Sequence, residues 1–235
     1  MLNWYLQSGN DSDVVLSTRI RAARNIKGFP FVTRYTKKDA LRIIEIVEEA
    51  VNSLGYGLKV IRLKDLDDIT KLSLVEKHII SPEFAYNKNE TGAIAINDDE
   101  NICIMINEED HIRIQVFSAG QELKNALNLE MEIDEKLSKL IPYSYSEKYG
   151  FLTSCPTNVG TGLRGSVMVH LPALTKTGNI RKVLEVVNGF DMNIRGLYGE
   201  GSKVSGDIYQ ISNKQTLGTV SYTHLRAHET RGNLV

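Results

Sequence analysis

Three short apolar runs between residues 92 and 117 constrain the fold of this chain more than any other feature. The stretch GAIAINDDENICIMINEEDHIRIQVF contains three largely apolar runs of five or six residues, which the polar breaks NDDEN and NEEDH separate. Runs this short and rich in isoleucine are typical of buried strands, and short polar breaks are typical of hairpin loops. The sequence therefore predicts an antiparallel meander in which NEEDH connects two strands.

Helical patterns lie on both sides of the meander. Thr36 is the expected N-cap of the first helix, because Asp39 follows three residues later, and Gly55 is its expected end. Its apolar stripe is Ala40, Ile43, Ile44, Val47, Val51 and Leu54. We expect a second helix from Ser118 and a third over residues 177–188. The inward-facing residues of the second helix are expected to be Leu123, Leu127, Ile133, Leu137 and Leu140.

Further strands are expected in residues 13–25 and, around a glycine-rich loop, within residues 192–218. Strands that occur in runs, with helices inserted between them, favour an α+β fold. We therefore expect an antiparallel β-sheet flanked by helices, with the helices covering one face. Cys103 lies within an apolar run and is expected to be a small buried residue of this sheet.

Composition and charge exclude several classes of function. The chain has 235 residues, a net charge of −1 and a pI near 6.5, which indicates neither a nucleic-acid partner nor an anionic membrane. It shows no signal-peptide pattern and no apolar run of the roughly 20 residues that span a bilayer. Two cysteines suggest reduced thiols in a cytoplasmic protein. We expect one domain over residues 1–220 and a non-native tail over residues 221–235.

Arginines recur at the ends of the expected strands, beside glycines and acidic loops. They are Arg19, Arg21, Arg113, Arg164 and Arg195. One guanidinium group can donate two parallel hydrogen bonds to phosphate oxygens, and it stays charged. Several arginines that converge therefore indicate a polyphosphate site. The sequence contains no P-loop motif, and GTGLRG does not satisfy the dinucleotide fingerprint. Taken alone, the NEEDH stretch fits a solvated acidic turn equally well.

Four longer motifs carry a family resemblance. In their order and spacing, STRIRAARN, INEEDHIRI, FLTSCPTNVGTGLRGSVMVHLP and IRGLYGEGS resemble the catalytic domain of the ATP:guanido phosphotransferases, or phosphagen kinases. VEKHIISPEF, RGLYGEGS and QISNKQTLG are most similar to the bacterial branch, the protein arginine kinases. The resemblance covers residues 1–218 and implies a catalytic domain of the guanidino kinase and glutamine synthetase type.

The resemblance implies transfer of the γ-phosphoryl group of Mg-ATP to a guanidinium nitrogen. A guanidinium is a cationic and poor nucleophile, so carboxylates must orient it and accept its proton. Glu109 and Glu200 match the family pair of carboxylates, with Glu200 as the expected base and Glu109 as the orienting partner, or the reverse. Cys155 matches the active-site cysteine, whose thiolate would help to orient the guanidinium; a lone cysteine is more often a small buried residue.

The same resemblance implies which residues bind the nucleotide. The arginines around the phosphates are expected to be Arg19, Arg21, Arg113, Arg164 and Arg195. Neighbouring residues of the motifs complete the set: Ser17, Thr18, Ile20, Gly165, Ser166, Val167, Met168, Gly196, Leu197, Tyr198 and Gly199. His78 matches a family histidine near the nucleotide, although without the resemblance a surface or capping role would be preferred. In this family the ligands of Mg²⁺ are mainly phosphate oxygens and water, so no residue is expected to bind the metal directly.

By the same resemblance, the expected partners are proteins with exposed arginines, a zinc-binding activator protein and the Clp protease system of protein quality control. Family members continue beyond this chain into a further C-terminal part, and a dimer is expected only with that part. Alternative functions are a kinase for a free guanidino compound, an inactive fragment that binds nucleotide or phosphoarginine, and a ligase of the glutamine synthetase type. The ligase would need several carboxylate metal ligands on strands, which the sequence does not show.

Overall fold

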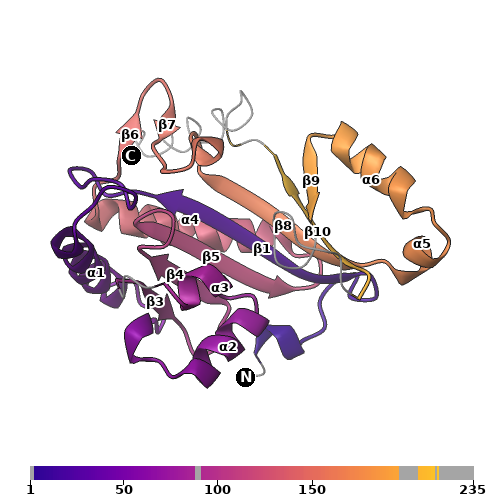
Figure 1. Ribbon diagram of the computed structural model, residues 1–235, viewed down its shortest axis with the longest axis horizontal. Helices are drawn as coiled ribbons and strands as arrows, with labels where there is room; N and C mark the ends of the chain where they lie inside the picture. Colours follow the sequence, from indigo (N-terminus) through magenta and orange to yellow (C-terminus); the bar gives the residue numbers. More distant parts are fainter. Residues whose placement is uncertain (1–2, 88–90, 196–205, 215, 217–235) are drawn as a thin grey trace, which may run out of the picture.

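An eight-stranded antiparallel sheet forms the centre of the molecule (Figure 1). The computed structural model describes residues 3–87, 91–195, 206–214 and 216. The strand order is β2-β3-β4-β5-β1-β8-β10-β9, so β1 and β8 lie near the middle. The strands are β1 (Val15–Arg24), β2 (Lys59–Arg62), β3 (Ala93–Ile96), β4 (Ile102–Ile106), β5 (Ile112–Ala119), β8 (Leu163–His170), β9 (Met192–Arg195) and β10 (Ile208–Asn213).

The predicted meander is confirmed as strands β3, β4 and β5, which are neighbours in the sheet. All five residues of β4 are buried, because helices cover both of its faces. Cys103 of β4 is a buried free thiol, as predicted, and burial raises its pKa to about 12. This part of the sheet is therefore structural core.

The helices α1 and α4 cover one face of the sheet, which we call the back face (Figure 1). The helices are α1 (Lys37–Asn52), α2 (Asp68–Glu76), α3 (Pro82–Ala85), α4 (Leu123–Leu140), α5 (Pro172–Lys176) and α6 (Ile180–Gly189). The capping box predicted at the start of α1 is confirmed. Thr36 Oγ1 accepts a hydrogen bond from the Asp39 backbone N–H, and the Asp39 carboxylate accepts one from Thr36 N–H.

Helix α4 begins later than predicted, and its buried stripe is shorter. Ser118 continues β5 and pairs with Thr18 of β1, so the helix begins only at Leu123. Ile133 and Leu137 are fully buried, as predicted, whereas Leu123 and Leu140 are 40% and 51% exposed. The apolar spacing identified the helix correctly but extended its buried stripe too far at both ends.

The opposite, or front, face is covered in part, which corrects the expectation of helices on one face. Helices α2 and α3 and the short 3₁₀ helix η1 (Trp4–Leu6) pack against β3, β4 and β5 there. Trp4 stacks on Phe117 of β5, with ring centroids 5.2 Å apart. Cavities open over the front face of β1, where the arginines lie.

The third predicted helix, over residues 177–188, is confirmed as α6, and the short helix α5, which was not predicted, precedes it. Gly178 has a φ of +71° and separates α5 from α6, because a left-handed residue ends a helix. The two strands expected around a glycine-rich loop are confirmed as β9 and β10, and residues 196–205 between them lie outside the described part. Helix α6 packs on β9 at one edge of the sheet (Figure 1).

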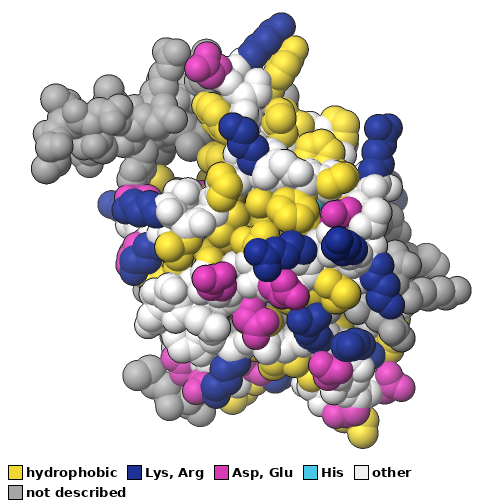
Figure 2. Space-filling model, turned by 90° about the vertical axis from the view of Figure 1, so that its left-hand side faces the viewer, with side chains coloured by type: hydrophobic (Ala, Val, Ile, Leu, Met, Phe, Trp, Pro, Cys, Tyr) yellow, Lys and Arg dark blue, Asp and Glu magenta, His cyan; other side chains and the backbone are white. Residues whose placement is uncertain are grey.

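The small hairpin β6–β7 (Tyr145–Ser146 and Gly150–Phe151) projects at the end of the molecule that also carries α1 (Figure 1). On this side, apolar side chains gather between lysine, arginine and acidic side chains (Figure 2). Phe151 forms a β-bridge with Gly160, which ties the hairpin to the start of β8. Among the helices that the structure describes, none is long and apolar enough to cross a membrane.

Candidate active site

The register of the central strands brings the predicted arginines to the front face. Arg21 of β1 pairs with Gln115 of β5 on one side and with Arg164 of β8 on the other. Paired residues in an antiparallel sheet point to the same face, and so do residues two apart on one strand. Arg19, Arg21, Arg113 and Arg164 therefore form one cluster, which we call the arginine cluster.

Mutual repulsion makes this cluster a site for an anion. Burial, together with Arg113 and Arg164, lowers the pKa of Arg19 to about 10. Burial, together with Arg19, Arg113 and Arg164, lowers the pKa of Arg21 well below its usual value. Within the described residues, the buried Nε of Arg21 has no hydrogen-bond partner. Partly buried like charges and an unsatisfied donor are unfavourable alone, and a polyanion would compensate both.

Two carboxylates of the NEEDH loop hold Arg113. Its Nη1 lies 2.7 Å from Glu108 Oε2, and its Nη2 lies 2.5 Å from Glu109 Oε2. The side chain of Glu108 is 16% exposed and that of Glu109 is 42% exposed. Glu108 is thus the internal counter-ion of the cluster, while the Glu109 carboxylate is accessible to a ligand.

Cys155 and Glu109 face the same cavity of about 240 Å³, which we call the acceptor cavity. Its polar lining also includes Asn158, whose Nδ2 lies 3.4 Å from Glu109 Oε2. The Sγ of Cys155 is 3.0 Å from Thr157 Oγ1. Glu109 and Cys155 come from different loops, so the cavity depends on how these loops are joined.

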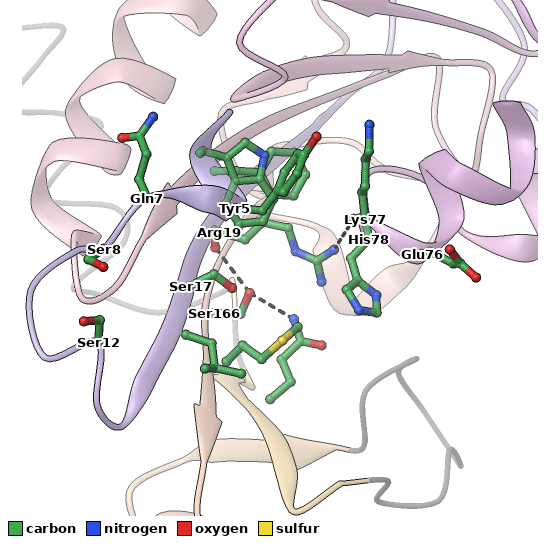
Figure 3. Close-up of a pocket in the computed structure, with 15 residues that line it drawn as sticks. Tyr5, Gln7, Ser8, Ser12, Ser17, Arg19, Glu76, Lys77, His78 and Ser166 are labelled. Atoms are coloured by element: carbon green, nitrogen blue, oxygen red, sulfur yellow. Dashed lines mark hydrogen bonds between the residues drawn. The ribbon is translucent and has the colours of Figure 1, made fainter. Parts of the chain in front are cut away.

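A second and larger cavity of about 550 Å³ lies at the opposite end of β1 (Figure 3). Arg19 crosses this cavity, and its Nη1 donates a hydrogen bond to the backbone oxygen of His78 at 3.3 Å (Figure 3). Ser166 Oγ donates to the Arg19 backbone oxygen at 3.3 Å and accepts from Gln210 Nε2 at 3.1 Å. Burial and Arg19 lower the pKa of His78, which favours a neutral imidazole.

A middle cavity of about 140 Å³ connects these two. It shares Arg19 and His78 with the large cavity, and Arg21, Arg113 and Arg164 with the acceptor cavity. Alternate residues of β1 therefore line three successive spaces. Ser17 and Arg19 face the first, Arg19 and Arg21 the second, and Arg21 and Ala23 the third.

The structure narrows the expected set of nucleotide ligands. Ser17, Ser166 and Met168 line the large cavity, but Thr18, Ile20, Gly165 and Val167 alternate to the back face. Thr18 Oγ1 donates to the Gly120 oxygen, and Ile20 belongs to the core under α4. Only the backbone of these four residues can reach a ligand on the front face.

Several expected residues lie outside the described part of the chain. They are Glu200, the expected base, and the neighbouring Gly196, Leu197, Tyr198 and Gly199. The backbone of Arg195 ends β9 and pairs with Gln210, whereas its side chain lies outside the described part.

Among the lining residues that sequence reasoning missed are Glu108, Asn158 and Gln210. Gln210 could have been found from its place on β10, because it pairs with Met168, which belongs to one of the family motifs. Asn158 follows Cys155 by three residues in TSCPTN, at the end of the 3₁₀ turn Pro156–Asn158. Glu108 was visible as one of three acids in NEEDH, but the sequence did not say which of them faces the arginines.

Comparisons with known proteins agree with this geometry. Residues 42–229 match the family model described as ATP:guanido phosphotransferase, C-terminal catalytic domain. The chain belongs to this family of phosphagen kinases. It is 48% identical over 212 residues to a protein-arginine kinase of Caldanaerobacter subterraneus and 46% identical over 219 residues to one of Geobacillus kaustophilus. These matches cover 88% and 92% of this chain but only 63% and 60% of the relatives, so the chain spans about three fifths of their length.

Solved structures of the family share the fold. A duplicated taurocyamine kinase from Schistosoma mansoni, with bound components of a transition-state analog, superimposes with a TM-score of 0.80 at 25% identity. The match covers 100% of this chain and 34% of that one. A lombricine kinase superimposes with a TM-score of 0.77 at 25% identity, over 94% of this chain and 64% of that one.

Proposed function

We propose that this chain is the catalytic part of a protein arginine kinase, which transfers the γ-phosphoryl group of Mg-ATP to an arginine side chain of a protein. One observation carries the proposal: alternate residues of β1 line a large cavity, an arginine cluster and a carboxylate-bearing acceptor cavity in succession. A nucleoside, a polyphosphate and a guanidinium would occupy these spaces in that order.

The nucleoside would occupy the large cavity beside His78 and Ser17, and the phosphates would lie among Arg19, Arg21 and Arg164. These arginines would neutralise the transferring phosphoryl group, which is where most catalysis of phosphoryl transfer originates. Mg²⁺ would enter with the triphosphate, bound to phosphate oxygens and water, and would shield the charge that develops between the phosphates. No protein group is assigned to the ion.

In the acceptor cavity, the guanidinium would contact the Glu109 carboxylate, with Cys155 and Asn158 beside it. Arg113 engages Glu109 in this structure. Phosphate oxygens would replace Glu109 on Arg113, which releases the carboxylate for the acceptor. Glu109 then aligns the attacking nitrogen with the γ-phosphorus, and a carboxylate accepts the proton as the P–N bond forms and the bond to the leaving ADP oxygen breaks. Glu200 remains the proposed base.

Arginine within a protein is favoured as the acceptor because the protein-arginine kinase relatives are 44–48% identical to this chain. The taurocyamine and lombricine kinases are only 25% identical, and they support a free guanidino compound as the second candidate. We also propose a cytoplasmic location, a zinc-binding activator and the Clp system as partners, dimerisation through a further C-terminal part, and residues 1–220 as the catalytic domain.

Mass spectrometry tests the proposal. A protein with accessible arginines, such as casein, is incubated with the chain and Mg-ATP, at a pH that preserves the acid-labile P–N bond. Phosphoarginine should appear, and it should be absent with Arg21→Ala. Phosphorylation of free arginine or another small guanidino compound, but not of protein arginine, would select the second candidate. Phosphorylation of lysine at a comparable rate would contradict the assignment, because a compact ammonium cannot bind a carboxylate in the planar paired geometry.

A further inference from the structure

Asp110 is a fully buried carboxylate in the NEEDH loop, next to Glu109. Its Oδ1 accepts two short hydrogen bonds, both of 2.6 Å, from Asn25 Nδ2 and from the backbone N–H of Ser154. Its buried Oδ2 has no hydrogen-bond partner in the described part of the chain. A buried carboxylate with one unsatisfied oxygen lowers stability, so an apolar loop core would be more favourable for folding alone.

The bond between Asp110 and Ser154 joins two segments that are 44 residues apart in sequence. Glu109 directly precedes Asp110, and Cys155 directly follows Ser154. Glu109 and Cys155, which line the same acceptor cavity, are therefore the immediate neighbours of the two residues in this bond. A change in its length would alter the separation of Glu109 and Cys155.

Asn25 extends the same network to the end of β1. Its Oδ1 accepts a hydrogen bond from the His111 backbone N–H at 3.0 Å, and its Nδ2 also donates to the Leu152 oxygen at 3.1 Å. Asn25 and Asp110 thus bind both loops of the acceptor cavity to a strand of the central sheet. The loops are fixed by side chains, since they share no strand pairing with each other.

We propose that Asp110 is a positioning residue for phosphoryl transfer: its carboxylate fixes the Ser154 amide and so sets the distance between Glu109 and Cys155. The inference rests on the proposed function of the acceptor cavity. A charged acceptor makes hydrogen bonds about twice as strong as a neutral one. Asp110→Asn keeps the size of the side chain but loses this charge, so the two loops should separate without a change in the arginine cluster.

Asn107 provides a matched control in the same loop. It is as fully buried as Asp110, and its Nδ2 donates to the backbone oxygens of Ala40 and Thr91 at 2.9 and 3.0 Å. It ties the start of the loop to α1, and no described hydrogen bond of its side chain reaches the segment that carries Cys155. Asn107→Ala therefore loosens the loop while leaving the bond between Asp110 and Ser154.

The experiment compares Asp110→Asn with Asn107→Ala in this chain, below the melting temperature of both. Asp110→Asn should accelerate hydrogen exchange of the Ser154 amide, measured by NMR, and lower kcat for arginine phosphorylation by about 100-fold, the scale of an ångström of misplacement. The KM for ATP should stay within about twofold, because the arginines are on strands. Asn107→Ala should lower the melting temperature without either the exchange effect or the loss of kcat.

Three results would overturn the inference: an unchanged kcat in Asp110→Asn, equal effects of the two variants on kcat and on the KM for ATP, or rapid exchange of the Ser154 amide in the unmodified chain. Exchange of the Ser154 amide in the unmodified chain tests the inference even if a variant does not fold. If the unmodified chain phosphorylates no arginine, the proposed function fails separately. In that case the positioning role is tested by two other measurements, hydrogen exchange of the Ser154 amide and the alkylation rate of Cys155. Both should change in Asp110→Asn and in Asn107→Ala neither should, and any other result would contradict the positioning role.

Discussion

The two ends of the candidate active site are built differently. The cluster of Arg19, Arg21 and Arg164 stands on adjacent strands, where backbone pairing fixes each side chain against its neighbours. The part of the acceptor cavity that carries Glu109 and Cys155 is formed by two loops, and side-chain hydrogen bonds from Asn25 and Asp110 hold these loops together. Strand register gives a position that single substitutions rarely disturb, whereas a loop held by a few side chains can be displaced by one of them.

The supports beneath the two ends differ as well. Under the arginine cluster, Ile20 and Ile114 pack against α4 in an apolar core. Beneath the acceptor end, Arg24 pairs with Asp134 of α4 at 2.7 Å and donates to the Thr161 backbone oxygen at 2.8 Å. The apolar support beneath the proposed nucleotide end is thus expected to be insensitive to pH, whereas the ionisable support beneath the acceptor end should respond to pH.

The largest expected effect concerns two arginines of β1 that face opposite sides. Arg21→Ala should lower turnover about a thousandfold or more, as loss of an arginine that stabilises phosphoryl transfer does. It should not lower the melting temperature, because burial and repulsion disfavour the charged form in the folded state. Arg24→Ala should instead lower the melting temperature, because it leaves the partly buried Asp134 carboxylate without its partner. Equal losses of stability would remove the distinction between the two sides.

The second prediction concerns Glu130 of α4, which lies beside Arg24 and Asp134. Burial, together with Asp134, raises the pKa of Glu130 to about 8 against an ordinary value of 4.5. Between these values the folded state keeps a proton that the unfolded state releases, so the free energy of unfolding should fall as pH rises, by on the order of 5 kcal/mol. Glu130→Gln should flatten the curve from denaturant titrations between pH 4.5 and pH 8. If Glu130→Gln leaves the dependence of the free energy of unfolding on pH unchanged, the ionisable support beneath the acceptor end is not pH-sensitive.

The third prediction separates the two roles of Glu109. Glu109→Gln should lower turnover by about 100-fold, through the loss of a group that orients the acceptor or takes its proton. Nucleotide should nevertheless bind several-fold more tightly, because Arg113 no longer has to leave a carboxylate. Asn158→Ala, which removes a contact to Glu109 but none to Arg113, should leave nucleotide affinity unchanged. Weaker nucleotide binding by Glu109→Gln would mean that Glu109 does not compete with phosphate.

The smallest effect concerns Thr18, which belongs to the same motif as the arginines but faces away from them. Its hydroxyl donates to the Gly120 oxygen and accepts from the Glu122 amide. Thr18→Val should lower the free energy of unfolding by about 1 kcal/mol, the typical net value of a hydrogen bond. Calorimetric titration should give a nucleotide affinity within a factor of two of the unmodified chain. A larger loss would place this side of β1 in the nucleotide site.

Sequence reasoning succeeded where local rules decide the outcome. Alternation along β1 was enough to put Arg19 and Arg21 on one face, and Thr36 with Asp39 marked the start of α1. The spacing of apolar residues gave α4 but not its start, because Ser118 to Ala119 continue a strand that has a partner in β1.

The loop-built end could not be predicted in the same way. Asp110 is bonded to Asn25, 85 residues earlier, and to Ser154, 44 residues later, and no local pattern specifies such pairs. The two-sided covering of β4 also depends on α2 and α3, whose place relative to the sheet is set by packing. The family resemblance named Glu109 and Cys155, and the structure adds the network that brings them to one cavity.

The alternation of β1 restricts how this strand can change during evolution. Its odd-numbered residues Ser17, Arg19 and Arg21 face the cavities, while Ile20 and Ala22 between them are buried in the sheet. Losing or gaining one codon within the strand would exchange the two sets, which would bury guanidinium groups in the core and expose isoleucine to the cavities. Substitutions can accumulate here one at a time, but a change in the length of β1 would remove the candidate active site in a single step.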